Sequence, residues 1–184
     1  MNVPPRPLGL SVEELFAPFA PTDDLPDYDF VAADAVPPPY HDLLVHRHHM
    51  TVTVEAFHGD LVDVRILASR LDGDSYTRKI LLVLQDSGRV VQFGVARVHL
   101  NFCSEPVREA IIAGKTPLGR ILIQHNVLRV VEPTGFLRVH ACPAVATWFG
   151  LNEPMPTYGR LAVIHCDGKE AIEVLEIVAP EGGS

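Results

Sequence analysis

The sequence predicts a single α+β domain built around a largely antiparallel β-sheet. Segments that alternate apolar and polar residues lie at 61–100 and again from about 127 to 179, with two helix-like segments between them. Strands, then helices, then strands again, joined by short turns, are typical of α+β folds rather than of the repeated βαβ units of parallel sheets. The length of 184 residues suits one domain with one hydrophobic core.

The first 39 residues are predicted to form an acidic, proline-rich extension ahead of a main domain at 40–184. Residues 1–40 contain seven Asp or Glu residues, one basic residue and nine of the 16 prolines. Because proline lacks a backbone donor and interrupts helices, this composition predicts mostly irregular structure. One short helix is expected after Ser11, with Phe16 and Phe19 packed on the main domain. We expect the core to fold without residues 1–38.

The strand predictions rest on alternation of apolar and polar residues between turn signals. The Asp167-Gly168 pair between two alternating runs predicts a C-terminal hairpin with a two-residue turn. The predicted strands are 51–57 (TVTVEAF), 61–69, 76–84, 89–100, 127–133, 135–141, 160–166 and 169–179. The predicted helices are 40–50, about 104–113 with Ser104 as its N-cap, and 117–124.

The stretch GKTPLGR at 114–120 contains the Gly-Lys-Thr of a phosphate-binding P-loop but not the first glycine of that motif. The P-loop requires a glycine five residues before Gly114, where this chain has Glu109. Gly114 is suited to end one helix, Thr116 to cap the next, and Pro117 to the first turn that follows. The stretch therefore predicts a tight corner between two helices.

Three charged residues lie on apolar faces of predicted strands. Alternate residues of a strand share a face. These residues are Glu176 with Ile172, Val174 and Val178; Arg78 with Ile80, Leu82 and Leu84; and Arg97 with Phe93 and Val95. Burial of an unpaired charge costs several kcal/mol, so such groups are paired or bind a ligand. Two interpretations follow: a structural ion pair or solvated strand ends, or a closed pocket whose arginines bind the two oxygens of a small carboxylate.

Composition and spacing disfavour several classes of protein. The cysteines Cys103, Cys142 and Cys166 are odd in number and lack C-x-x-C spacing, which indicates a reducing compartment and no disulfide framework. The HRHH stretch at 46–49 lacks further ligands at metal-site spacing, so no metal is expected. The chain shows no basic stripe, membrane-length apolar run or signal-peptide pattern. We expect a cytoplasmic protein with a small-molecule partner, no nucleic acid and no membrane.

Four short stretches together suggest a family. They are HHMT (48–51), SYTRKILL (75–82), GKTPLGR (114–120) and LEIVAP (175–180). In order and spacing the chain resembles the chorismate pyruvate-lyase family, in particular its short bacterial branch, from about Leu43 to Pro180. The resemblance implies an antiparallel sheet with helices and flaps over an internal ligand site.

The resemblance also implies roles for individual residues. Arg78 and the backbone amides of Met50 and Leu118 would bind the ring carboxylate, and Glu176 would face the opposite end of the ring as a general acid or hydrogen-bond partner. In the corner at 114–120, free backbone N–H groups at a helix N-terminus would bind the carboxylate, as such groups bind phosphate in other proteins. The family's second arginine falls at Val95 here. Arg97, two residues further on the same face, is assigned to the pyruvyl carboxylate.

The expected function is therefore that of a lyase that eliminates pyruvate from chorismate and gives a hydroxybenzoate, most simply 4-hydroxybenzoate. Such an enzyme needs no cofactor, because aromatisation drives the step; its catalytic residues would be Glu176 and Arg78. Two alternatives remain open. One is a non-catalytic small-acid-binding domain of the same fold, as in the ligand-sensing domains of certain bacterial transcription regulators, although the acidic, irregular 1–40 segment does not predict a DNA-binding head. The other is a secondary-metabolism relative acting on another chorismate-derived acid.

Overall fold

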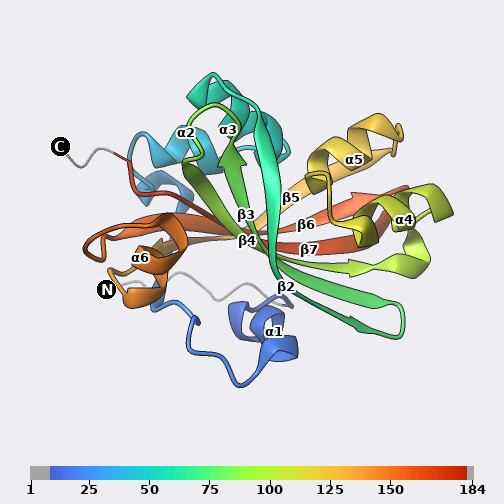
Figure 1. Cartoon of the computed structure of the whole chain (residues 1–184), viewed down its shortest axis with the longest axis horizontal. Helices are drawn as coiled ribbons and strands as arrows, with labels where there is room; N and C mark the ends of the chain where they lie inside the picture. Colours follow the sequence, from blue (N-terminus) through green and yellow to red (C-terminus); the bar gives the residue numbers. More distant parts are fainter. Residues whose placement is uncertain (1–8, 182–184) are drawn as a thin grey trace.

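The computed structural model describes residues 9–181, which form a seven-stranded antiparallel sheet with helices on both faces (Figure 1). The strands are β1 (Tyr28–Val31), β2 (Val62–Asp72), β3 (Ser75–Leu84), β4 (Val90–His99), β5 (Arg129–Val139), β6 (Thr157–Cys166) and β7 (Lys169–Val178). The α-helices are α1 (Val12–Phe16), α2 (Tyr40–Leu44), α3 (Met50–His58), α4 (Glu105–Ala113), α5 (Leu118–Gln124) and α6 (Pro143–Phe149). Three short 3-10 helices are η1 (Ala17–Phe19), η2 (Ala33–Ala35) and η3 (Leu100–Phe102). The predicted α+β class with one antiparallel sheet is confirmed.

The two faces of the sheet carry different sets of helices. On one face α1 and α6 contact β4, and Phe93 stacks on Trp148 with ring centroids 3.8 Å apart. The other face carries two helical pairs, α2 with α3 over one half of the sheet and α4 with α5 over the other half. The two pairs meet where α3 contacts α5. The candidate site lies at this junction.

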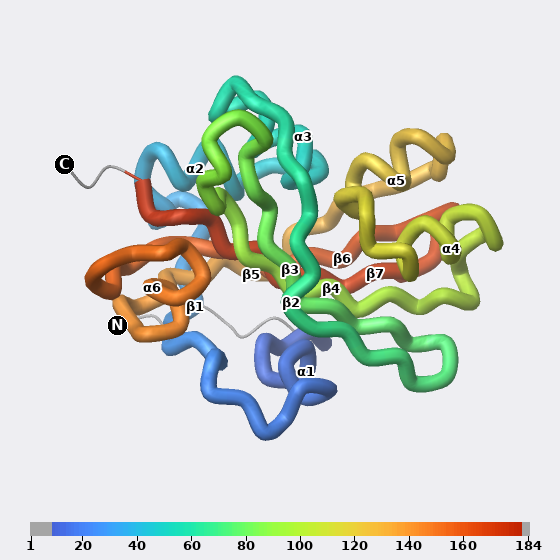
Figure 2. The backbone as a smooth tube through the Cα atoms, in the orientation of Figure 1, coloured from blue at the N-terminus to red at the C-terminus, as the bar shows by residue number. Residues whose placement is uncertain are grey.

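The C-terminal strand joins the two halves of the sheet. The strand order is β1-β5-β6-β7-β4-β3-β2, so β7 pairs with β6 on one side and with β4 on the other. Figure 2 shows this arrangement, with the red C-terminal strand running beside the green strand β4. The predicted Asp167-Gly168 turn is present, with both residues at positive φ as such tight turns require.

The segment 51–57, predicted as a strand, is helical, and this prediction is wrong. Its Thr-Val-Thr-Val alternation is typical of strands, but Met50 and Val54 are four residues apart and both are buried on one side of α3. That spacing places two side chains on one helix face. The helix ends at Gly59, which adopts the left-handed conformation with φ of 68°. Burial thus outweighs the β-propensity of the threonines and valines.

The N-terminal segment is more closely integrated into the fold than an extension would be. Ser11 caps α1 by accepting a hydrogen bond from the Glu14 amide at 3.1 Å, as expected, and Phe16 is 2% exposed. β1 pairs with β5 at one edge of the sheet, and Asp24 accepts a hydrogen bond from Lys79 at 2.8 Å. Described residues of the predicted extension therefore pack on the sheet of the main domain.

Further elements differ from the sequence predictions. The helix predicted at 40–50 ends at Leu44, and β1 was not predicted. The strands expected at 127–133 and 135–141 are one strand, β5, with an irregular register between Pro133 and Gly135. Helix α6 was not predicted, and it packs its buried residues Val145 and Trp148 on the sheet. Among residues 9–181, none of the helices combines the length and apolar character needed to cross a membrane.

Candidate functional site

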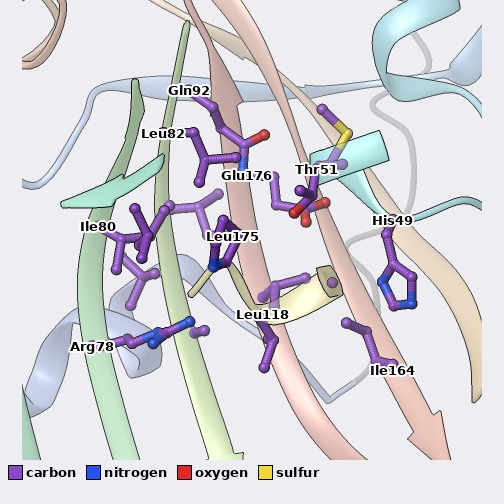
Figure 3. Close-up of a pocket in the computed structure, with 18 residues that line it drawn as sticks. His49, Thr51, Arg78, Ile80, Leu82, Gln92, Leu118, Ile164, Leu175 and Glu176 are labelled. Carbon is purple, nitrogen blue, oxygen red and sulfur yellow. The ribbon is translucent and has the colours of Figure 1, made fainter. Parts of the chain in front are cut away.

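A small cavity lies between the sheet and the first turns of α3 and α5. Its volume is about 50 Å³, and it is lined by residues of β2, β3, β4, β6 and β7 and by the starts of these two helices. Figure 3 shows Arg78 at one end of the cavity, with Gln92 and His49 at its other sides. Arg78 and Gln92 share one face of the sheet because Arg78 pairs with Ala96, four residues from Gln92 along β4. The two side chains thus approach the cavity from different positions along the strands.

A glycine on the cavity floor keeps this space open. Gly94 of β4 lies between the flanking strands, and a Cβ atom there would be 3.3 Å from the carbonyl oxygen of Leu175 and 3.4 Å from Cδ1 of Ile80. A methyl group would therefore be crowded and would occupy part of the cavity. The direct neighbours of Gly94 on the adjacent strands are Ile80 on β3 and Glu176 on β7, and both line the cavity.

Arg78 is the most deeply buried charge at the cavity. Its side chain enters from β3 and is 1% exposed. One terminal nitrogen donates to the carbonyl of Ile111 at 3.3 Å, and Nε has no hydrogen-bond partner in the protein. Among residues 9–181 Arg78 forms no ion pair. Burial lowers the pKa of Arg78 from its ordinary value, and the neighbouring Tyr76 partly opposes that shift.

Met50 and Leu118 are the first residues of the two helices that cover the cavity. The first backbone N–H groups of a helix have no partner within it, so these amides are available to an acceptor at the helix start. The two helix starts come close together because residue 119 is glycine. A Cβ atom at Gly119 would be 3.0 Å from Cβ of His49 and 3.1 Å from Oγ1 of Thr51. The structure therefore brings Arg78, Met50 and Leu118 to one cavity.

Glu176 also lines the cavity, but it is ion-paired. Nε of Arg160, on the neighbouring strand β6, donates to the Glu176 carboxylate at 2.6 Å, and Arg160 is fully buried. The other two nitrogens of Arg160 donate to the backbone carbonyls of Leu44, His46 and His48 at 2.9–3.2 Å. One guanidinium thus ties the wall of the cavity to the loop that leads into α3. Two of these carbonyls, those of His46 and His48, belong to the HRHH stretch.

The same loop shows no metal geometry. Within the described part of the chain, no three His, Cys, Asp or Glu side chains come together as ligands. Nδ1 of His46 lies 3.4 Å from the Arg160 guanidinium, and burial together with this cation lowers the pKa of His46. A lowered pKa favours the neutral ring. His46 is therefore explained by packing against Arg160.

His49 is the third buried polar group at the cavity. It precedes α3, it is 8% exposed, and its Nε2 atom has no hydrogen-bond partner in the protein. Burial, followed by the nearby Arg129 and Arg160, lowers the pKa of His49 to about 4. The ring is neutral at pH 7 and can donate or accept through Nε2 according to its tautomer.

Arg97 does not reach the cavity. As the sequence pattern indicated, it shares a strand face with Phe93 and Val95, but that is the face covered by α1 and α6. Arg97 forms a salt bridge with Glu173, and this interaction raises the pKa of Arg97 and lowers that of Glu173. Arg97 was expected to contact a second carboxylate of the substrate. Because its side chain lies on the other face of the sheet, it is not placed to make that contact.

The sequence pattern did not identify Arg160, Gln92 and His49 as site residues. The signal for Arg160 was available, because it alternates with Ala162 and Ile164 on one apolar face of the C-terminal hairpin, opposite Glu176. Gln92 likewise alternates with Gly94 and Ala96. His49 could not be found in this way, because its burial depends on the approach of α5 to α3.

Comparison with known proteins establishes the fold only. No protein-family model and no curated protein sequence matches the chain. The crystal structure of PhnF from Mycobacterium smegmatis is similar with a TM-score of 0.50 and 10% identity, over 76% of this chain and 67% of that one. The crystal structure of the effector domain of PhnF from Mycobacterium smegmatis is similar with a TM-score of 0.50 and 10% identity, over 73% of this chain and 90% of that one. For the ligand-binding domain of a GntR-family transcriptional regulator from Bordetella bronchiseptica the TM-score is 0.49 and the identity 16%, over 65% of this chain and 86% of that one.

The expectation that the chain is an enzyme, a chorismate pyruvate-lyase, is corrected by this comparison. That expectation came from four short sequence stretches, whereas the similar structure that is matched over 90% of its length is the effector domain of PhnF, so the fold does not indicate a lyase. Among the described residues that line the cavity, Arg78 is the one arginine or lysine, and the carboxylate expected to act as general acid, Glu176, is paired with Arg160.

Proposed function

We propose that the chain is a non-catalytic binding domain for a small carboxylic acid, which it holds between Arg78 and the first backbone amides of α3 and α5. The observation that carries this proposal is the buried, unpaired Arg78 guanidinium with its partnerless Nε atom. An isolated buried charge is costly, and an arginine fork is well matched to the two oxygens of a carboxylate. A bound carboxylate would supply the missing counter-charge.

The size of the cavity restricts the acid. A dry cavity of about 150 Å³ accommodates benzene, whereas this cavity encloses about 50 Å³. A short aliphatic acid is therefore the ligand that the present packing accommodates with least change. An aromatic acid requires the first turns of α3 and α5 to move apart.

The test is a binding titration of the purified protein with butyrate, benzoate and chorismate, followed by NMR or calorimetry. Binding of a monocarboxylate, with no pyruvate released from chorismate, is the expected result. Arg78→Lys retains the charge but loses the fork, and should weaken binding about tenfold or more, since a hydrogen bond to a charged group contributes roughly 1.5–3 kcal/mol. Arg138→Lys, at an exposed position of β5, is the matched control.

Two results would reject the proposal. One is the failure of all three acids to bind to protein that is shown to be folded. The other is equal affinity for the wild type and for a folded Arg78→Lys protein.

A further inference from the structure

The cavity is lined almost entirely by buried residues. Among those that the structure describes, only Val64 of β2 and Leu118 of α5 are half-buried, and the others are buried. A solute of the size of an organic acid therefore reaches the cavity only after part of this wall has moved. The structure contains one place where a single side chain forms the wall.

A much larger groove lies on the other side of His49. Its volume is about 550 Å³, and it is open to solvent, because Val52 and Leu128 in its lining are 46% and 71% exposed. Among the described residues, His49 is the one that lines both the cavity and the groove. Figure 3 shows its side chain across the cavity from Arg78. His49 therefore forms the wall that the two spaces share.

The ring of His49 is held in this wall by packing. Its Nε2 atom is buried without a hydrogen-bond partner in the protein, which is unfavourable. Rotation of the side chain into the groove would expose Nε2 to water, and the hydrogen bond gained there offsets part of the packing that is lost. The backbone is anchored separately, because the carbonyl of His49 accepts hydrogen bonds from the amide and the hydroxyl of Thr53, each at 3.2 Å. The ring can thus move while α3 stays in place.

The groove is positively charged. It is lined by Arg47 and Arg129 and by no described Asp or Glu, and neither arginine forms an ion pair with a described residue. One nitrogen of Arg129 donates to the carbonyl of Val127 at 3.0 Å, which holds the guanidinium at the groove. Its charge acts on the shared wall, since after burial it contributes most to the lowered pKa of His49. A cleft lined by one sign of charge concentrates ions of the opposite sign and raises their association rates.

We propose that the groove is the entrance to the cavity, that His49 is the gate between the two, and that Arg47 and Arg129 attract the anionic ligand to this entrance. The ligand in this inference rests on the function proposed above, whereas the gate can be tested without any acid. The carboxylate would pass from the cations of the groove to Arg78 on the far side of the cavity. The competing entrance lies at the half-buried Val64.

Access to the cavity is measured by the reactivity of a thiol placed inside it. Ile80→Cys puts a thiol on the cavity wall, at a position that is 8% exposed. Methyl methanethiosulfonate converts an accessible thiolate to a mixed disulfide and releases methanesulfinate, so the labelling rate reports how often the cavity opens. The tryptic peptide 80–89 contains no native cysteine, and mass spectrometry of this peptide therefore follows the one site.

In the Ile80→Cys protein, the additional change His49→Ala should raise the labelling rate about tenfold or more, because a minor open state is typically populated at about 0.1–10%. The alanine keeps the Cβ atom that packs against Gly119 and removes only the ring. Val64→Ala truncates the residue at the competing entrance and is the matched control. An equal or larger increase with Val64→Ala would overturn the gate, and so would an unchanged rate in folded His49→Ala protein.

Global unfolding is monitored in the same samples. Cys166 is 2% exposed and lies in the core, so its labelling reports opening of the whole domain. The gate requires that His49→Ala accelerate labelling at position 80 and leave labelling of Cys166 unchanged. Parallel acceleration at both positions would show that the variant acts through stability, and the gate would be rejected.

The charges at the entrance are tested with benzoate or butyrate, whichever binds. The double variant Arg47→Gln with Arg129→Gln should lower the association rate about tenfold at low ionic strength, the lower end of the range for electrostatic steering, and leave the dissociation rate unchanged. The difference from the wild type should shrink in concentrated salt. Arg138→Gln, at an exposed position near the other end of β5, is the control. NMR line shapes across the titration provide both rates.

The outcomes separate this inference from the proposed function. If no acid binds to folded protein, the proposed function fails together with the role of Arg47 and Arg129, and the labelling experiment still decides whether His49 is the gate. If acids bind in an Arg78-dependent manner but the double arginine variant matches Arg138→Gln, this entrance is wrong and the proposed function stands. If His49→Ala does not fold, the association rates of the arginine variants decide the entrance.

Discussion

Arg160 shows how one residue holds together parts of the site that are distant in sequence. Its guanidinium contacts the carboxylate of Glu176 on β7 and three carbonyls between α2 and α3. A buried ion pair is weak evidence for net stability, but removal of one partner leaves the other charge uncompensated. The consequences of this arrangement can be measured residue by residue.

Arg160→Met should destabilise the protein by about 3–5 kcal/mol, because Glu176 would then be a buried charge without its partner. The double variant Arg160→Met with Glu176→Gln should recover part of that loss, since no unpaired charge remains. Urea denaturation of both proteins measures the difference in the free energy of unfolding. Equal stability of the single and double variants would show that the pair is not energetically coupled.

His49 should make the free energy of unfolding depend on pH. Its pKa is about 4 in the folded protein against 6.5 for an ordinary histidine, so the unfolded chain takes up the proton first as the pH falls. The contribution of the neutral His49 ring to the free energy of unfolding is complete above pH 6.5. It is lost progressively as the pH falls from 6.5 to 4, by at most about 3 kcal/mol.

The pH effect is tested against a His49→Gln variant, because burial also lowers the pKa values of His46 and His58, so both act on the pH dependence of stability in the same direction. The variant should lose clearly less stability than the wild type between pH 6.5 and 4.5. Parallel curves for the two proteins would assign the pH dependence to the other histidines.

At the scale of elements, the approach of α3 to α5 determines the shape of the cavity. Gly119 permits that approach, because a Cβ atom there would be 3.0 Å from His49. Alanine favours a helix over glycine by up to about 1 kcal/mol, so helix propensity alone predicts a more stable variant. The close contact with His49 predicts instead that the alanine variant is less stable.

Gly119→Ala should therefore lower the free energy of unfolding, by about 1–2 kcal/mol, as is usual for an overpacked site. Thermal denaturation provides the measurement, and Gln124→Ala at the exposed end of α5 provides a control without the contact. A rise in the midpoint temperature of Gly119→Ala would mean that the two helices separate easily.

The sequence predicted the elements whose pattern is local and missed those that depend on distant packing. The C-terminal hairpin follows from its Asp-Gly turn, and Arg78 and Glu176 were recognised as charges among apolar strand residues. Helix α3 was mistaken for a strand because Met50 and Val54 are buried by partners elsewhere in the chain. Arg97 and Arg160 both lie on apolar strand faces, and alternation alone does not indicate which face carries the cavity.

At the scale of the whole molecule, the N-terminal segment belongs to the core. Leu15 and Phe16 are buried with Phe93 and Trp148 on the sheet face opposite the cavity. We therefore predict that residues 9–38 are needed for the fold, in contrast to the expectation from their composition. A chain without them should lose the cooperative unfolding transition of the full protein.

Phe16→Ala tests the same point without truncation. Removal of a buried phenylalanine costs about 3–5 kcal/mol, so the urea midpoint should fall markedly. Leu25→Ala, at a side chain that is 42% exposed, is the control and should change stability little. If the two variants behaved alike, α1 would not be part of the core in solution.

The position of β7 in the sheet has a consequence for protein synthesis. β4 and β6 are not paired with each other, and β7, the last strand in chain order, lies between them. Until β7 leaves the ribosome, the earlier strands can form only two separate partial sheets with exposed inner edges, which are prone to aggregation. Glu176 lies on the same strand, so the pocket is completed in the same step that joins the two halves. A nascent chain stalled before residue 169 should accordingly bind no acid and should be a good substrate for chaperones.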